Sequence, residues 1–542
     1  MFLNLLGAAK GGLIRAAAST QTLDGTLPYS GMSNDMNLLE RCLLLILTAL
    51  LAAAQVSAQT VQNAPSTRYW PTRGWRSSSP EAQGMDSAKL VEAFDYIQQH
   101  KVPIHSLLIV RNGNIVLDAY FYPYQNDQLH DGASMTKSVT STLIGIAIGQ
   151  HKLAGVNQPV LSLFPQRTIA NRDERKEHVT IEQLLTMTSN LDCRSQHEAT
   201  LSEMMQSKDW IKFMLDLPMS NDPGNKFVYC SGGMHLLSGI ISHTTGVSAL
   251  EFARRELFRP LGINDVVWPA DPNGITYGWG DLHLRPRDWA KLGYLWLNHG
   301  HWEDRQLVPV DWMETAIQVH SRASWGDQYG YGFWVHAERN PPEFEALGRG
   351  GQRVSVLPAL NLIVIFTGGE FEPGDIGKLI GQSLKSDKPL PEDPAGAARL
   401  RKATSEASRP PASQPVVPEP PISKTVSGKS YHLESNPIDL KSFSATFSGS
   451  NEAVVRLEFT DGRIEQRPVG LDEVPRISPG GRFGLPVALK GVWESNDTFV
   501  LEYNEVANIN SYSFRMTFSG NDVSVQLKEK TGLKEGKFHG HR

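Results

Sequence analysis

Two residues with the spacing of a nucleophile and its base stand at the start of a predicted helix. Ser134 and Lys137 form an S-x-x-K motif, and apolar residues recur at helical spacing over residues 134–150. Positions i and i+3 share one helix face, so the Lys137 amine can meet the Ser134 hydroxyl. Serine needs a nearby base to act as a nucleophile, and burial favours the neutral amine. The Ser134 backbone N–H lies in a first helical turn and can donate to an oxyanion.

Two further groups follow along the chain. Tyr229 opens the run Tyr229-Cys230-Ser231, and a phenol beside a cationic lysine could carry the serine proton to the leaving group. The run 347–352, Leu-Gly-Arg-Gly-Gly-Gln, precedes an apolar strand pair. Glycines there would let a substrate approach the backbone, and an N–H could complete an oxyanion hole. Taken separately, each motif also has a purely structural interpretation: Tyr229 could be a core residue at the end of a strand, and the glycines could form a flexible turn.

A sheet and a helix must position these groups, and the sequence predicts both. Residues 104–110 and 115–120 are β-branched apolar runs joined through Asn112-Gly113, the strongest short hairpin signal. Residues 354–366 favour two more short strands. Helix and strand patterns alternate from about Ser77 to Thr367, and we expect one domain over residues 77–382.

The composition changes after this domain. Residues 383–424 are rich in Pro, Ala, Ser and charge, and we expect them to form a semi-extended linker because they hold few large apolar side chains. Residues 425–542 show only short alternating strands with tight turns, which predicts a small all-β sandwich or a lipocalin-like barrel. We expect this domain to pack against the catalytic domain or to bind a ligand.

The N-terminal region indicates export. Residues 36–58 hold an apolar run of about thirteen residues and end at Val56-Ser57-Ala58, a cleavage pattern typical of a signal peptide. The run is short for a bilayer span, so we expect no stable membrane span after cleavage, with a retained anchor as the alternative. A signal peptide stands at the N-terminus of the translated chain, so we expect that translation starts at Met36 and that residues 1–35 come from an over-extended gene prediction. We therefore expect a periplasmic or secreted bacterial protein.

The net charge, the cysteines and the absence of certain motifs exclude several classes of protein. The formal net charge is −5 at neutral pH, which gives no reason to expect nucleic acid as a partner. Export leaves Cys193 and Cys230, which form either one disulfide or two buried thiols. No spacing suggests a metal site, and we expect no cofactor. No G-x-S-x-G elbow is present, which excludes an α/β-hydrolase.

The order of the motifs resembles one family. S-x-x-K, then Tyr229-x-Ser231, then a glycine-rich strand is similar to class C β-lactamases and their penicillin-binding, family VIII carboxylesterase and nylon-oligomer hydrolase relatives. The resemblance implies a β-lactamase/transpeptidase-like fold, an antiparallel sheet flanked by helices plus a helical subdomain. It also implies an acyl-enzyme on Ser134, with Lys137 and Tyr229 moving the proton. The backbone N–H groups of Ser134 and Gln352 would then hold the oxyanion.

The departures from the family pattern favour an esterase or amidase. Ser231 stands where many β-lactamases have Asn, and Arg349-Gly350-Gly351 replaces a K-T-G strand while still offering positive charge to a substrate. We expect Ser231, Arg349, Gly350 and Gly351 to contact a small ester or amide substrate. The alternatives are a β-lactamase or D-Ala-D-Ala carboxypeptidase and, from another class, a catalytically silent ligand-binding sensor.

Overall fold

A computed structural model describes residues 69–194 and 198–542 of the chain. The expected signal peptide (36–58) and the segment before it (1–35) lie outside these residues. In the described part, no helix combines the length and the apolar character needed to cross a membrane.

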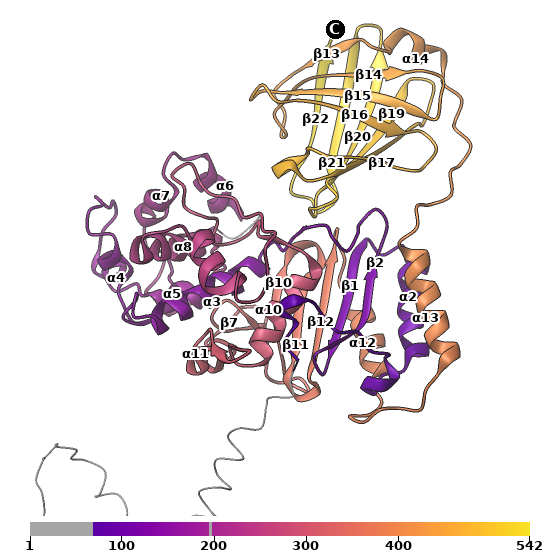
Figure 1. Ribbon diagram of the computed structural model, residues 1–542. Coiled ribbons are helices and arrows are strands. Elements are labelled where there is room, and N and C mark those ends of the chain that lie inside the picture. The colour runs from indigo at the N-terminus through magenta and orange to yellow at the C-terminus, as the bar shows by residue number, and fades with distance from the viewer. Residues whose placement is uncertain (1–68, 195–197) are drawn as a thin grey trace, which may run out of the picture. The chain divides into compact units, whose positions relative to one another are not determined.

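An antiparallel sheet of long and short strands forms the centre of the first domain (Figure 1). In the described chain it has eight strands, in the spatial order β2 (Asn114–Tyr120), β1 (Ile104–Arg111), β12 (Leu362–Gly368), β11 (Gln352–Leu357), β10 (Glu343–Gly348), β9 (Trp334–His336), β8 (Gln328–Tyr329) and β7 (Ser321–Arg322). The predicted hairpin is confirmed as β1 and β2. Asn112 and Gly113 have φ of 50° and 75°, the left-handed pair that a tight hairpin turn requires.

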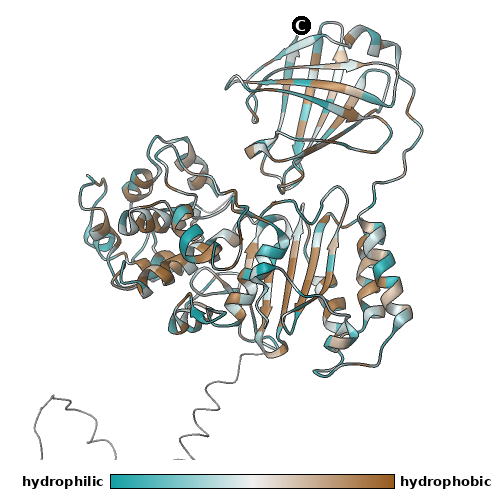
Figure 2. Cartoon of the chain, in the orientation of Figure 1, coloured by the Kyte–Doolittle hydropathy of each residue, from teal (hydrophilic) through white to brown (hydrophobic). Residues whose placement is uncertain are grey.

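The alternation of side chains along the strands gives each face of the sheet its own core. Leu107 and Ile109 of β1 pack toward one helical layer, made of α2 (Ser87–Gln99), α12 (Gly374–Ser383) and α13 (Pro394–Ala407). Leu108 and Val110 face the opposite layer, which contains α3 (Met135–Gly149) and α10 (Pro286–Leu297). Because both faces are covered, the central strands are apolar along much of their length (Figure 2).

Helix α3, the predicted helix after Ser134, is packed on all sides. Its residues 135–147 are all buried, as expected for a helix between a sheet and a helical subdomain. That subdomain contains α4 (Glu174–Glu177), α5 (Ile181–Leu185), α6 (Ala199–Gln206), α7 (Trp210–Asp216), α8 (Ser231–Thr245) and α9 (Ala249–Ala253), and α11 (Val310–Ala316) packs against α3. The expected β-lactamase/transpeptidase-like α+β fold is confirmed.

Part of the expected linker is folded. Residues 394–407 form α13, which packs on α2, with Leu400 almost fully buried. The composition was misleading because Ala403 and Ala407 need little volume to pack helix on helix and so add no strong apolar signal. Residues 410–420 contain no helix or strand and are largely exposed, and α14 (Pro421–Val426) follows them.

The C-terminal domain is a closed barrel, so the barrel alternative is confirmed and the sandwich is not. Within the described chain nine strands close through the pairings β13–β22 and β16–β18, and β17 (Arg476–Ser478) adds to β18. The barrel strands are β13 (Ser430–Leu433), β14 (Leu440–Phe447), β15 (Glu452–Phe459), β16 (Ile464–Gly470), β18 (Val487–Trp493), β19 (Thr498–Asn504), β20 (Ser511–Ser519), β21 (Asp522–Glu529) and β22 (Glu535–His541).

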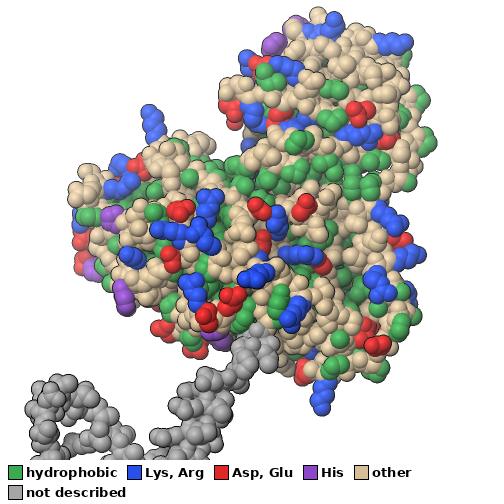
Figure 3. Space-filling view, viewed as in Figure 1, with side chains coloured by type: hydrophobic (Ala, Val, Ile, Leu, Met, Phe, Trp, Pro, Cys, Tyr) green, Lys and Arg blue, Asp and Glu red, His purple; other side chains and the backbone are tan. Residues whose placement is uncertain are grey.

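Charges of both signs are interspersed on the molecular face shown in Figure 3. This distribution agrees with the small net charge of the sequence.

Candidate active site

The first turn of α3 brings the serine and the lysine of the S-x-x-K motif into contact. Lys137 Nζ donates to Ser134 Oγ over 2.7 Å and to the backbone oxygen of Trp279 over 3.0 Å. The Lys137 residue is only 1% exposed, whereas Ser134 is partly open to solvent. An amine held against a hydroxyl in a buried pocket has the arrangement of a base and a nucleophile.

The turn before Ser134 is held in an uncommon conformation. Ala133 has φ of 44°, and its N–H donates over 2.7 Å to the carboxylate of Asp131. Gly132 is required by a close approach, because a Cβ there would lie 2.2 Å from the indole of Trp289. Asp131 belongs to the short strand β3 (His130–Asp131), which pairs with β4 (His283–Leu284). These contacts fix the start of α3 and with it the direction of the Ser134 side chain.

Tyr229 lies beside the lysine. Its ring centroid is 4.8 Å from Lys137 Nζ, and the ring stacks on Trp334 at 6.2 Å. Tyr229 is half-buried at the end of the segment leading into α8. The structure therefore brings the three predicted catalytic residues together, with the face of the Tyr229 ring toward the lysine.

Ser231 makes a contact that sequence reasoning missed. Its hydroxyl donates to Glu198 Oε1 over 2.9 Å, and Glu198 is the residue before α6. A disulfide joins Cys193 to Cys230, so the segment carrying Glu198 is tied to the residue next to Ser231. No local pattern marks Glu198 as a site residue, because its partner is 33 positions away.

The end of β10 approaches the nucleophile. A Cβ on Gly348 would lie 2.4 Å from the backbone oxygen of Gly132 and 3.0 Å from Ala133 Cβ. The backbone after β10, at Gly348 and Arg349, therefore lines the cavity near Ser134. Gln352, whose backbone N–H we expected to complete the oxyanion hole, pairs with Gly348 at the start of β11, and its side-chain amide exchanges two hydrogen bonds with the backbone of Gly368.

The two glycines after Arg349 are packed against other parts of the protein: Gly350 against the C-terminal domain and Gly351 against Phe371 of the catalytic domain. A Cβ on Gly350 would lie 2.4 Å from the Ile509 side chain, and one on Gly351 would lie 2.5 Å from Phe371. Close packing thus accounts for both glycines, which have φ of 77° and 94°. Gly350 and Gly351 do not belong to the lining of the cavity formed by described residues.

Arg349 spans from the turn to the barrel. Its guanidinium donates to Asn510 Oδ1 over 3.0 Å and to Thr531 Oγ1 over 2.9 Å. The side chain that we expected to offer positive charge to a substrate uses these donors in a contact with the C-terminal domain.

A cavity of about 990 Å³ extends from Ser134 to the barrel. Tyr229, Ser231, Trp279, Trp334 and Glu198 line it from the catalytic domain. Side chains of β14, β15, β19 and β20 line it from the barrel, and sequence reasoning assigned none of them to the site. Strand alternation shows which residues face a lumen but not which domain the lumen opens toward.

Ionisable groups of both signs stand around the cavity. Burial raises the pKa of Asp131, and burial likewise raises the pKa of Glu505 despite the nearby Arg482. Arg482 forms an ion pair of 2.8 Å with Asp281. The positive charge of Arg482 is therefore balanced by the carboxylate of Asp281.

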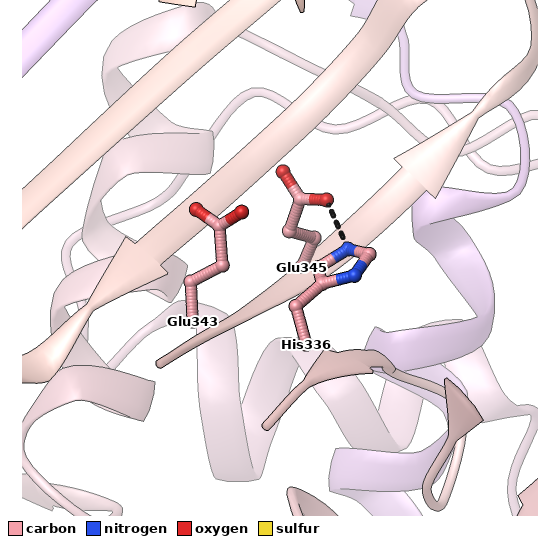
Figure 4. Close-up of side chains that lie close together, drawn as sticks. All are labelled: His336, Glu343 and Glu345. Atoms are coloured by element: carbon pink, nitrogen blue, oxygen red, sulfur yellow. Dashed lines mark hydrogen bonds and ion pairs between the residues drawn. The ribbon is translucent and has the colours of Figure 1, made fainter. Parts of the chain in front are cut away.

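A separate group of potential metal ligands lies on β9 and β10 (Figure 4). His336, Glu343 and Glu345 offer ligand atoms within 4.8 Å of one another, and His336 Nε2 lies 2.8 Å from Glu345 Oε2. Arg339 pairs with Glu343, and Arg353 lies 3.5 Å from Glu345. Because two guanidinium groups already balance the carboxylates, we assign an ion-pair network rather than a metal centre.

The described domain has a β-lactamase/transpeptidase-like fold, and Ser134 and Lys137 lie in contact at the start of α3. The Beta-lactamase family model matches residues 79–375, more than half of the chain, and the chain belongs to this family.

Among curated proteins, the chain is similar to a 6-aminohexanoate-dimer hydrolase of Paenarthrobacter ureafaciens, with 23% identity over 238 residues. This match covers 41% of the chain and 59% of the relative, so the chain spans about three fifths of that relative's length.

Solved structures with similar folds include a family VIII carboxylesterase, with 15% identity and a TM-score of 0.45, covering 61% of this chain and 98% of that one. An octameric penicillin-binding protein homologue from Pyrococcus abyssi has 19% identity and a TM-score of 0.44, covering 83% of this chain and 99% of that one.

Proposed function

We propose that the protein hydrolyses a carboxylic ester or amide of a small molecule through an acyl-Ser134 intermediate. The observation that carries this proposal is the 2.7 Å contact between Lys137 Nζ and Ser134 Oγ at the base of a cavity. The similarity to a protein named 6-aminohexanoate-dimer hydrolase supports an ester or amide substrate class.

The chemistry runs in two halves. Ser134 Oγ attacks the carbonyl carbon while its proton passes to Lys137 or Tyr229, and the tetrahedral oxyanion receives hydrogen bonds from backbone N–H groups. Collapse of this adduct breaks the bond to the leaving group, which takes the proton. Water then attacks the acyl-serine with the same groups acting as base, which releases the acid and restores Ser134.

The backbone candidates for the oxyanion hole are the Ser134 N–H and the N–H groups at the end of β10. Gly348 and Arg349 line the cavity next to the nucleophile turn, which favours their amides over that of Gln352. A donor in such a hole typically contributes about two to three orders of magnitude in kcat.

The surroundings of the serine favour an ester or amide without a carboxylate near the reacting bond. Glu198 places a carboxylate beside Ser231, and two guanidinium N–H groups of Arg349 donate to Asn510 and Thr531, which holds this side chain toward the barrel. A β-lactam carries a carboxylate that needs a free cationic partner at this position. We therefore propose esterase or amidase activity ahead of β-lactamase activity.

Initial rates on a short-chain p-nitrophenyl ester and on a chromogenic cephalosporin, measured in parallel, test the proposal. We expect ester turnover that is lost in Ser134→Ala and weak or no cephalosporin turnover. Ester turnover that persists in Ser134→Ala would identify another nucleophile. Efficient cephalosporin turnover would instead assign the protein to the β-lactamases, and binding without turnover of either class would favour a sensor.

We further propose that the protein is exported and acts on a small molecule outside the cytoplasm. The apolar run within residues 36–58 and the disulfide between Cys193 and Cys230 support this location. N-terminal sequencing of protein recovered from the periplasm or medium should begin at Gln59. Recovery of uncleaved protein in the cytoplasm only would contradict it.

A further inference from the structure

The cavity beside Ser134 continues into the open end of the barrel. Its barrel side is lined mainly by apolar side chains, namely Ile438, Leu440, Leu457, Phe459, Phe514 and Leu533. Leu440, Leu457 and Phe514 belong to the barrel core, so the cavity reaches the lumen.

The alternation along β15 separates the lumen from the outer surface. Leu457 lines the cavity and is 5% exposed, and Ala453 and Val455, of the same strand parity, are buried in the barrel core. Val454, of the opposite parity, does not belong to the barrel core or to the cavity lining. The strand therefore offers one lumen position and one outer position for matched substitutions.

Among the charged side chains at the barrel end of the cavity, Arg463, Arg482 and Lys534 have partners, whereas Glu505 Oε2 is buried without one among the described residues. Arg463 pairs with Glu465 and lies over the Phe459 ring, with its guanidinium carbon 3.7 Å from the ring centroid. Lys534 Nζ donates to the backbone oxygen of Pro437 over 3.0 Å. The lumen end of the cavity thus presents apolar surface, which suits an apolar ligand group.

One loop of the barrel holds this opening against the nucleophile turn. The Asp131 N–H donates to the Ala507 oxygen over 2.8 Å, and His283 Nε2 lies 2.7 Å from Asn508 Oδ1. Asn510 accepts from Arg349 three residues beyond Ala507. Asp131 also orients the residue before Ser134, so the barrel contact and the nucleophile share one anchoring group.

We propose that the barrel lumen is a binding chamber for the apolar tail of the substrate, and that it makes the enzyme selective for esters or amides with a medium-length chain. This inference rests on the proposed function, because the chain enters the chamber from the bond that Ser134 attacks. Each methylene buried in such a chamber raises kcat/KM roughly three- to fourfold until the chamber is filled.

Two series of substrates test the selectivity and distinguish the two sides of the ester. The first varies the acyl group of p-nitrophenyl esters from acetyl to dodecanoyl, and the second varies the alcohol of alkyl acetates over the same lengths. We expect kcat/KM to rise at least about tenfold with chain length in one series. The series that rises identifies whether the acyl or the alcohol chain occupies the chamber, and flat or falling profiles in both would overturn the proposal.

Matched variants on β15 locate the chamber. Leu457→Gln should lower kcat/KM for the long-chain esters far more than for the acetyl ester and so remove most of the rise with chain length, whereas Val454→Gln on the outer face should keep the rise. Equal loss in the two variants, at comparable melting temperatures, would contradict a lumen site.

A binding measurement separates this inference from the catalytic proposal and from folding defects. Full-length Ser134→Ala protein is titrated calorimetrically with octanoate, octanol and acetate. We expect binding of at least one eight-carbon ligand and none of acetate, even if no ester proves to be a substrate. Absence of binding by both eight-carbon ligands would overturn the chamber, whereas loss of ester turnover alone would overturn only the proposed function.

Discussion

Lys137 Nζ lies 2.7 Å from Ser134 Oγ, and the same nitrogen donates to the backbone oxygen of Trp279. Two acceptors therefore fix the lysine against the serine. We expect Lys137→Ala to lower kcat about a hundred- to ten-thousandfold with a smaller change in KM, because the variant loses a base rather than a binding contact. Lys137→Arg should not restore the rate, since the guanidinium stays charged. Steady-state kinetics on the ester measure kcat and KM separately. A variant with unchanged kcat and a raised KM would exclude Lys137 as the base.

The hydrogen bond between Ser231 and Glu198 couples two walls of the cavity. We expect Ser231→Ala and Glu198→Ala to lower kcat/KM by non-additive amounts, with a coupling free energy of about 0.5–1.5 kcal/mol. A double-mutant cycle measures this coupling. Glu203→Ala provides the control, because Glu203 lies on α6, the helix that Glu198 precedes, and pairs with exposed Arg194. Strict additivity of the two cavity variants would show that the contact has no role in turnover.

The disulfide between Cys193 and Cys230 closes a segment of 37 residues. Replacing both cysteines by serine should lower the free energy of unfolding by about 2–4 kcal/mol, because the unfolded chain gains freedom. Thermal unfolding should show the same shift in the wild type after reduction and no effect of reductant on the double variant. An unchanged wild-type midpoint under reducing conditions would contradict a stabilising role.

Two buried histidines beside the barrel predict loss of stability in acid. His130 Nδ1 lies 2.9 Å from the Asp131 oxygen and must donate to it, so His130 Nε2 accepts from His105 Nδ1 over 2.7 Å. Burial lowers the pKa of His130 to about 4 and lowers the pKa of His105 well below its usual value. Between about pH 6.5 and 4 the unfolded chain binds more protons than the folded one, so stability falls as the pH falls.

The expected slope is up to about 1.4 kcal/mol per pH unit for each histidine. Denaturant unfolding at a series of pH values measures it. His130→Asn should reduce the slope in this interval, and an unchanged slope in that variant would assign the acid sensitivity to other groups.

Arg349 ties the glycine-rich turn to Asn510 and Thr531 of the barrel. Arg349→Ala should loosen this contact and speed proteolytic cleavage within residues 410–420, the segment without helix or strand between the domains. Limited proteolysis followed by mass spectrometry detects the cut. Arg515→Ala is the matched control, because Arg515 forms an exposed ion pair with Glu494 within the barrel. Equal cleavage rates in the two variants would show that Arg349 does not hold the domains together.

Short sequence motifs predicted those parts of the structure in which the contacting residues are neighbours in the sequence. Asn112-Gly113 specified the hairpin because few residue pairs adopt two successive left-handed conformations. The S-x-x-K spacing placed Lys137 on Ser134 because one helical turn decides that contact.

Long-range contacts were not accessible in the same way. The partners of Arg349 lie 161 and 182 residues further along the chain, so its residue type indicated only a free positive charge. Closure of the barrel depends on the pairing of β13 with β22, and the alternating strands alone are equally compatible with a sandwich.

The strand that completes the barrel follows the catalytic residues far along the sequence. β22 (Glu535–His541) pairs with β13 through His541 opposite His432 and Gly540 opposite Leu433. A ribosome has therefore synthesised Ser134, Lys137 and Tyr229 long before the barrel can close. A nascent chain released before β22 would carry the catalytic groups without the finished barrel beside them, so the wall that the barrel contributes to the cavity forms only after β22 has been synthesised.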